Sequence, residues 1–174
     1  MEERVLDFIS RRFPNESNWM NGNCFFFAQI LKARFHGDIV YDPIDGHFLL
    51  LAPDGQFYDW TGKREYDENY AQNLKAGIDS IKTFNNLFGE YPYDTYSVIA
   101  SDFYIGGMEY PTLVMIDQSL YNEKDKFLLE YVIAHETAHQ WWYSVIGNDE
   151  ISEPWLDEAL TEYSTILYFE IFVF

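Results

Sequence analysis

Cysteine is almost missing from this sequence. The 174 residues include one cysteine, Cys24, so the chain can form no internal disulfide. Long apolar runs are missing too, because no hydrophobic stretch approaches the roughly 20 residues that a transmembrane helix needs. Residues 1–13 alternate charged with apolar side chains and lack the apolar centre and the small-residue cleavage site of a signal peptide. We therefore expect no membrane span and a cytoplasmic location.

Basic residues are also scarce. The chain has 11 Lys and Arg against 29 Asp and Glu, which gives a formal net charge of -18. Such a charge repels phosphate backbones and anionic lipid surfaces, so we expect no nucleic-acid partner. It is compatible with an acidic cleft that attracts metal ions and free amino termini. Apolar residues make up 48% of the chain and aromatic residues 20%, enough for a packed core.

The negative charge is concentrated in the second part of the chain. Residues 1–66 contain seven basic and ten acidic residues, a net of -3, whereas residues 67–174 contain four and nineteen, a net of -15. The change falls in the polar segment 61–70, which we interpret as a linker. We therefore predict two parts. Residues 1–66 would form a small unit of helices and a β-hairpin, and residues 67–174 a second domain.

Hydrophobic periodicity and turn residues predict an α+β fold for the whole chain. Helices are expected over residues 2–13, 24–35, 68–88, 124–146 and 154–172. Strands are expected over residues 46–52, 56–60, 95–103 and 112–117. Pro53-Asp54-Gly55 provides the turn between the first two strands, and residues 104–111 are expected to form a loop or a strand edge.

The segment HETAH at residues 135–139 lies within a predicted helix. Positions four apart lie one above the other on a helix, so the imidazoles of His135 and His139 can approach one metal ion. Glu136 lies about 100° round the helix. There it can border the metal and activate a water molecule without being a ligand. The competing interpretation is a chance HExxH pattern, with histidines that serve only in the core or on the surface.

A catalytic zinc ion needs three protein ligands and one open position. Glu158 can supply the third ligand, because it follows His139 by nineteen residues and lies on the next predicted helix. Two histidines and a glutamate are the ligand types of hydrolytic zinc sites. We therefore predict one Zn²⁺ per chain, bound by His135, His139 and Glu158.

The order of these residues resembles the aminopeptidase-N-like zinc metallopeptidases, gluzincins in which HExxH is followed by eighteen residues and a glutamate, as here. GGMEYP at residues 106–111 resembles that family's exopeptidase signature GAMEN, and WLDEALTEY at residues 155–163 resembles its WLNEG segment. The resemblance covers about residues 67–170. It implies a partial thermolysin-like catalytic domain and an aminopeptidase that acts on peptides with a free amino terminus.

The resemblance also implies roles for individual residues. Glu136 would deprotonate the attacking water and later protonate the leaving amine. Glu109 would hold the free α-amino group of the substrate, and Gly106 and Gly107 would offer backbone groups to an extended peptide. The residue types agree with these roles, since a glycine pair permits close backbone approach and a carboxylate suits an ammonium group. The alternative for Glu109 is a solvated acid at the end of a strand.

The chain also departs from the family's pattern. Tyr110 replaces the asparagine of GAMEN, and Asp157 and Ala159 replace the asparagine and glycine of WLNEG. The family has further domains on both sides, and a catalytic tyrosine well beyond the third ligand. We therefore expect a fragment or a fusion with impaired activity, because loss of an oxyanion donor lowers rates about 10²–10³-fold. The apolar run at residues 166–174 indicates association through the carboxyl-terminal end.

A second set of candidate residues lies in the first part of the chain. Cys24 begins a predicted helix, while His47 and Asp59 lie on the two predicted hairpin strands. This order is similar to papain-like and transglutaminase-like folds, and it implies a thiol nucleophile, its base and a residue that orients the base. The alternative is a structural cysteine in the core. Three functions therefore stay open: a zinc aminopeptidase, a thiol hydrolase or acyltransferase, and a non-catalytic fusion.

Overall fold

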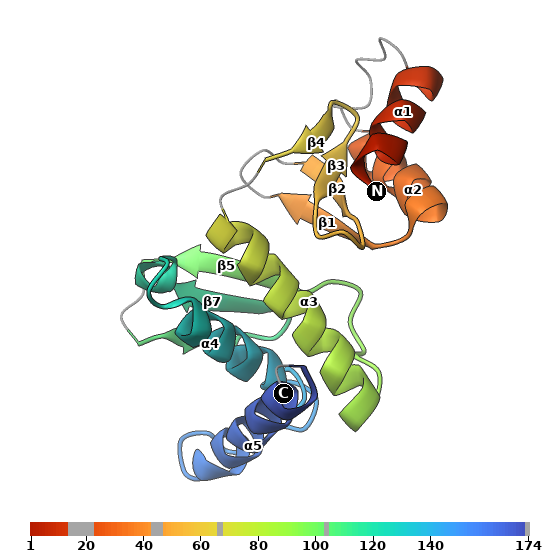
Figure 1. Ribbon diagram of the computed structural model, residues 1–174. Coiled ribbons are helices and arrows are strands. Elements are labelled where there is room, and N and C mark those ends of the chain that lie inside the picture. The colour runs from red at the N-terminus through yellow and green to blue at the C-terminus, as the bar shows by residue number, and fades with distance from the viewer. Residues whose placement is uncertain (14–22, 43–46, 66–67, 103–104, 173–174) are drawn as a thin grey trace. The chain divides into compact units, whose positions relative to one another are not determined.

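The computed structural model of the protein describes residues 1–13, 23–42, 47–65, 68–102 and 105–172. It divides into two compact units, Met1–Tyr66 and Asp67–Phe174. Each unit has its own sheet and its own helices (Figure 1). Each unit also has its own apolar core. This mixture of helices and sheets confirms the predicted α+β class. Among the described helices, none is both long enough and apolar enough to cross a membrane.

The first unit combines two helices with a four-stranded antiparallel sheet. Its helices are α1 (Glu2–Arg12) and α2 (Cys24–Phe35). Its strands lie in chain order across the sheet: β1 (Asp38–Asp42), β2 (His47–Leu51), β3 (Phe57–Asp59) and β4 (Gly62–Arg64). The predicted two-stranded hairpin was therefore too small. Strand β4 lies in the segment interpreted as a linker, because its polar residues become a strand only through pairing with β3.

Helix α2 packs one face against the core of this unit. Its buried residues are three or four positions apart, as in an amphipathic helix: Cys24, Phe27, Ala28, Leu31 and Phe35. The core cluster also includes side chains of α1, β2 and β3, so that it joins all these elements: Val5, Ile9, Phe27, Leu31, Phe35, Leu50, Ala52 and Tyr58. Cys24 therefore lies on the buried side of its helix.

The second unit consists of three helices and a three-stranded sheet, with two helices against the sheet and the third packed on those two helices (Figure 1). Its helices are α3 (Glu68–Phe88), α4 (Lys126–Ala138) and α5 (Trp155–Phe172), with a short 3₁₀ turn η2 (Gln118–Leu120). Its strands are β5 (Ser97–Ser101), β6 (Gly107–Met108) and β7 (Leu113–Asp117). Strand β7 lies in the centre, parallel to β5 and antiparallel to β6. Two residues of the segment predicted as a loop or a strand edge therefore form an outer strand of the sheet.

Helix α4 is held by apolar contacts on two sides. Leu129 and Ile133 belong to a cluster with side chains of α3 and β7. Ala134 and Ala138 belong to a second cluster, with side chains of α3 and α5. Residues packed on both sides have little freedom to move. The HETAH segment therefore lies on a firmly placed helix.

Helix α4 ends at Ala138, earlier than the predicted end at residue 146. The chain then forms an irregular turn, in which Ser144 N–H donates to the carbonyl of His139 at 3.0 Å and Tyr143 has a φ of 125°. The prediction was wrong because the aromatic residues 141–143 continue the apolar pattern of the helix. His139 keeps helical angles, φ -59° and ψ -16°, so it still lies one turn from His135.

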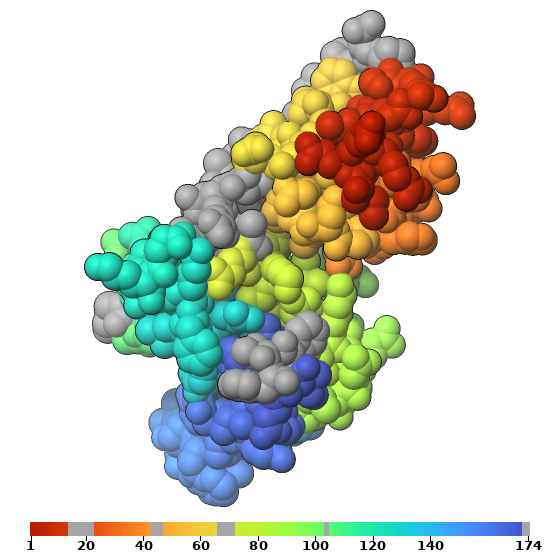
Figure 2. All heavy atoms as spheres, in the orientation of Figure 1, coloured from red at the N-terminus to blue at the C-terminus, as the bar shows by residue number. Residues whose placement is uncertain are grey.

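Helix α5 is only partly covered by the rest of the described second unit. Tyr168 and Phe169 lie in the core, whereas Leu160, Tyr163 and Ile166 are exposed. Figure 2 shows atoms of α5, in blue, on the surface of the molecule. Exposed apolar side chains on one helix are typical of a surface that another element or partner covers. Association through this end of the chain stays a prediction.

Candidate metal centre

Three predicted ligands converge at the junction of α4 and α5. The donor atoms of His135, His139 and Glu158 lie within 4.8 Å of one another. Glu158 Oε2 is 3.3 Å from Nε2 of His135 and 3.8 Å from Nε2 of His139. A tetrahedral zinc ion with ligand distances of about 2.0–2.1 Å separates neighbouring donors by about 3.4 Å. The donors therefore have the types and the spacing that suit zinc.

The three donors differ in their access to solvent. The side chain of His139 is 1% exposed and that of His135 is 18% exposed, whereas that of Glu158 is 54% exposed. Burial and the neighbouring His139 lower the pKa of His135, against the opposing effect of Glu158 and Glu162. A lower pKa keeps the imidazole neutral, the form that binds a metal. The two histidines are thus shielded from solvent, whereas the side of the site that carries Glu158 is open to it.

The ring of His139 is oriented by the turn that follows α4. Its Nδ1 lies 3.1 Å from the carbonyl oxygen of Trp142 and 3.2 Å from Thr161 Oγ1. A buried carboxylate, Asp157, lies 3.8 Å from the same nitrogen. Such partners fix the ring so that the other nitrogen faces the metal. The sequence interpretation missed Thr161, although its position three residues after Glu158 on one helix face is a usable signal.

A second carboxylate approaches the ring of His135. Glu162 Oε2 lies 3.4 Å from His135 Nδ1. The geometry is that of an ion pair rather than a hydrogen bond, so His135 Nδ1 has no hydrogen-bond partner among the described residues. The hydroxyl of Tyr131 donates to Glu162 and holds it in place. Glu162 lies one helical turn after Glu158 on α5. The sequence interpretation did not include Glu162 among the site residues.

Glu136 is a buried carboxyl group beside the ligands. Its Oε2 has no hydrogen-bond partner among the described residues. Burial raises the pKa of Glu136 to about 8, and the charges of Glu109 and Glu158 add to the increase. A carboxyl group that titrates near neutral pH can both accept and return a proton. The unpartnered oxygen at this place also fits a site that is completed by a metal and a water molecule.

Strand β6 passes directly over Glu136. A methyl group at Gly107 would lie 2.3 Å from Glu136 Oε1, so only glycine leaves room for the carboxylate in this position. Gly106 has a φ of 88°, which favours glycine. The carboxylate of Glu109 lies within 4.8 Å of donor atoms of His139 and Asp157. The structure therefore brings Gly107 close to Glu136 and Glu109 close to the candidate ligand His139.

The first unit brings together two of its three candidate residues. Nε2 of His47 lies 3.1 Å from Oδ2 of Asp59, and both side chains are buried. Cys24 is free of a disulfide and buried. No hydrogen bond links Cys24 to His47 in the part of the chain that the structure describes. The pair formed by His47 and Asp59 needs a physical explanation of its own.

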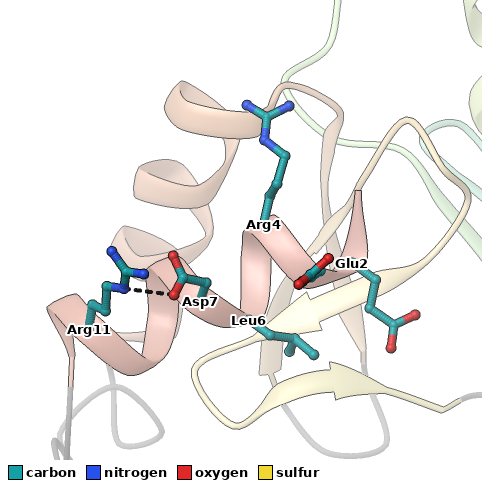
Figure 3. A pocket seen from close by; sticks show the side chains of 6 residues that line it. Glu2, Arg4, Leu6, Asp7 and Arg11 are labelled. Atoms are coloured by element: carbon teal, nitrogen blue, oxygen red, sulfur yellow. Dashed lines mark ion pairs between the residues drawn. The ribbon is translucent and has the colours of Figure 1, made fainter.

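A surface hollow on α1 offers no comparable chemistry. It is lined by one apolar and five charged side chains: Glu2, Glu3, Arg4, Leu6, Asp7 and Arg11. Figure 3 shows the ion pair between Arg11 and Asp7, with Nε and Oδ1 2.7 Å apart. The charged residues around it are exposed, so a bound ligand would stay in contact with water. We assign this hollow no function.

Comparisons with known proteins identify the family of this chain. The Peptidase family M1 domain matches residues 72–172. Leucine aminopeptidase 2 of Candida glabrata is 38% identical over 85 residues, which cover 48% of this chain and 13% of the relative. Aminopeptidase B of Homo sapiens is 35% identical over 115 residues, 62% of this chain and 16% of the relative. Aminopeptidase 2 of Candida albicans is 30% identical over 138 residues, 74% of this chain and 14% of the relative. The chain therefore spans a small part of the curated relatives it matches.

Proposed function

The chain belongs to peptidase family M1, and from this premise we propose that its second unit is a zinc-binding catalytic segment that removes amino-terminal residues from peptides. One zinc ion would be held by His135, His139 and Glu158. The observation that carries the proposal is the convergence of these three donors beside the unpartnered carboxylate of Glu136. When bound, zinc polarises the scissile carbonyl and makes a water molecule more acidic.

Glu136 is the proton carrier in this proposal. Its Oε2 takes a proton from the attacking water and returns it to the nitrogen of the leaving amine. Both transfers need a carboxyl group that holds a proton more readily than a solvated glutamate, and burial raises the pKa of Glu136. Burial under β6 keeps other water molecules away from the carboxylate. The single residue thereby serves as base and then as acid.

Glu109 and the edge of β6 would position the peptide. A carboxylate close to the metal centre attracts the free α-ammonium group of a substrate. An extended peptide can pair with the outer strand β6, where the lack of a side chain at Gly107 allows close approach. Recognition of the amino terminus at this distance from the metal limits cleavage to the first peptide bond. The substrate class is therefore peptides with a free amino terminus.

Two variants test the proposal. We expect one zinc ion per purified chain, and no zinc in the His139→Ala variant, because one of the three protein ligands is lost. Glu136→Gln keeps the shape of the side chain and should retain zinc while lowering kcat about 10²–10⁴-fold. Metal analysis and hydrolysis of aminoacyl-arylamides measure both effects. Glu170→Gln, on the exposed face of α5, is the control and should change neither.

The outcomes separate the remaining alternatives. Bound zinc with no turnover of any aminoacyl-arylamide would favour a non-catalytic remnant and contradict the aminopeptidase. A chain that binds no zinc, even when zinc is added, would contradict the metal centre itself. Glu109→Gln gives a third measurement, since loss of the ammonium-binding charge should raise KM more than it lowers kcat.

A further inference from the structure

We propose that Gln140 is a positioning residue that sets the distance between the carboxylate of Glu109 and the candidate metal centre. Through this distance it fixes which peptide bond of a substrate reaches the metal. The inference rests on the proposed aminopeptidase function and deepens it, since it names the residue that keeps cleavage one position from the amino terminus. Gln140 itself is neither a candidate metal ligand nor part of the substrate-binding segment.

The backbone of Gln140 belongs to the end of the metal-bearing helix. Gln140 directly follows the candidate ligand His139, and its side chain is fully buried. Its backbone N–H donates to the carbonyl of Thr137 at 3.1 Å, and that of His139 donates to the carbonyl of His135 at 3.3 Å. The side chain of Gln140 therefore starts from a point that is fixed relative to both histidine ligands.

The amide group of Gln140 reaches the turn that follows Glu109. Its Oε1 accepts a hydrogen bond from the backbone N–H of Thr112 at 2.8 Å. Its Nε2 donates to the backbone carbonyl of Tyr110 at 3.2 Å. Only one orientation of the amide satisfies both bonds, because the oxygen can only accept and the nitrogen can only donate. One buried side chain thus holds the turn at two points.

Thr112 has a backbone conformation that this turn does not adopt at no cost. Its φ is 66°, in the left-handed region that a β-branched residue rarely enters. Such a conformation persists only where the surrounding contacts determine it, and it is concentrated at functional sites. Here the N–H is bound by Gln140, and the carbonyl accepts from the N–H of Ser97 at 2.9 Å. The turn is therefore held from outside by these partners.

Glu109 lies between two fixed points of the chain. Before it, β6 pairs with β7 up to Met108. After it, the carbonyl of Tyr110 accepts hydrogen bonds from Gln140 and from a backbone N–H of the turn itself. The carboxylate of Glu109 lies within 4.8 Å of a donor atom of His139. Gln140 thus connects the residue that follows Glu109 to the residue that follows a zinc ligand's helix turn.

This connection matters because the substrate has a fixed length. The α-ammonium group of a peptide and its first scissile carbonyl are one residue apart, so the carboxylate of Glu109 and the metal must keep a matching distance. A misplacement of about 1 Å can lower a rate about 10²-fold. Without Gln140, we expect the turn to relax while the three metal ligands stay in place. A merely structural side chain would change stability but not the preference for a free amino group.

The experiment uses the zinc-loaded full chain and two probes, leucine hydroxamate and its N-acetyl derivative. Gln140→Met removes both hydrogen bonds and nearly keeps the side-chain volume. We expect the wild type to bind the free amine more tightly, and the ratio of the two affinities to fall about 10–100-fold in the variant. Titration calorimetry measures the ratio. Zinc content should not change, and KM for leucine 4-nitroanilide should rise more than kcat falls.

A double-mutant cycle shows whether Gln140 acts through Glu109. Glu109→Gln should itself remove most of the preference for the free amine. Gln140→Met should then add nothing in the Glu109→Gln background, because the two changes remove the same interaction. Gln118→Met replaces an exposed glutamine of the same unit and should leave the ratio unchanged. Hydrogen exchange gives a readout without zinc, since the amide of Thr112 should exchange faster in Gln140→Met.

The outcomes separate this inference from the proposed function. An unchanged affinity ratio in folded Gln140→Met, independent losses in the double variant, or no preference in the wild type would overturn the positioning role. Turnover by the wild type with an unchanged ratio would leave the aminopeptidase standing alone. A ratio that falls without any turnover would support the positioning role and contradict the aminopeptidase. If Gln140→Met fails to fold, Gln140→Glu keeps the acceptor for Thr112, loses the donor to Tyr110 and should lower the ratio in the same direction.

Discussion

Glu162 places a second carboxylate beside the candidate metal ligand His135. It lies 3.4 Å from Nδ1 of His135 and accepts a hydrogen bond from Tyr131. Glu162→Ala should weaken zinc binding about 10–100-fold, because carboxylates behind a ligating histidine raise its basicity and fix its orientation. Competition with a chelator of known affinity measures the change. Glu170→Ala removes an exposed charge from the same helix, and an equal loss in that variant would assign the effect to net charge instead.

The residues of the site differ in how far the sequence could predict them. Helix geometry places His135 and His139 on one face, and Glu158 has the residue type of a third ligand. Residue type and position in the sequence were therefore sufficient to select three side chains that the structure brings together. The carbonyl of Trp142 could not be predicted, since a backbone group has no residue type to signal it. The close approach of Gly107 to Glu136 could not be predicted from the sequence either, because it depends on how β6 crosses α4.

At the scale of elements, α4 fixes the position of the ligands. Ile133 lies on α4 and is fully buried against side chains of α3 and β7. Ile133→Ala should therefore destabilise the second unit by about 2–5 kcal/mol, the cost of a cavity in a packed core. Urea unfolding followed by circular dichroism measures it. Leu128→Ala on the exposed side of the same helix is the control, and a similar loss in both variants would mean that α4 is not anchored through this face.

Elements with a clear period were predicted well. The bounds of residues 24–35 and 68–88 agree with α2 and α3, because an apolar stripe and a following glycine mark both helices. Strand β1 was missed, since its five residues include an aspartate at each end. The end of α4 was missed because hydrogen bonds from residues 144 and 146 back to the helix end depend on tertiary structure. Local patterns thus specify helices better than short paired strands.

At the scale of the molecule, both units bury tyrosine side chains. Burial raises the pKa of Tyr58 in the first unit and of Tyr96 and Tyr168 in the second, and it raises that of Tyr91 to about 12. The tyrosine hydroxyl groups of the unfolded chain ionise near pH 10, whereas those buried in the folded protein ionise only at higher pH. Stability is therefore complete below pH 10 and should fall as the pH rises from 10 towards the folded pKa values.

Urea midpoints at pH 8, 10 and 11.5 measure this loss, and tyrosinate absorbance near 295 nm should rise with unfolding. Tyr163 is exposed on α5 and serves as a matched control, because Tyr163→Phe should leave the alkaline slope unchanged. Tyr96→Phe should make the slope shallower. A midpoint that does not move between pH 8 and 11.5 would show that these hydroxyl groups ionise equally in both states.

The two units have separate cores, and the proposed metal centre lies in the second alone. A ligand stabilises only the cooperative unit whose folded state it binds. Free zinc at about 1,000 times Kd should therefore add about 4 kcal/mol to the second unit and nothing to the first. Calorimetry should show two transitions, of which a chelator lowers one.

The His139→Ala variant decides whether this shift comes from the proposed site. Its second transition should not respond to zinc, while its first should match that of the wild type. A single transition that shifts with zinc would mean that the two units unfold as one. A shift that persists without His139 would mean that zinc binds elsewhere. The first transition should also stay unchanged under chelation, because the candidate metal ligands all belong to the second unit.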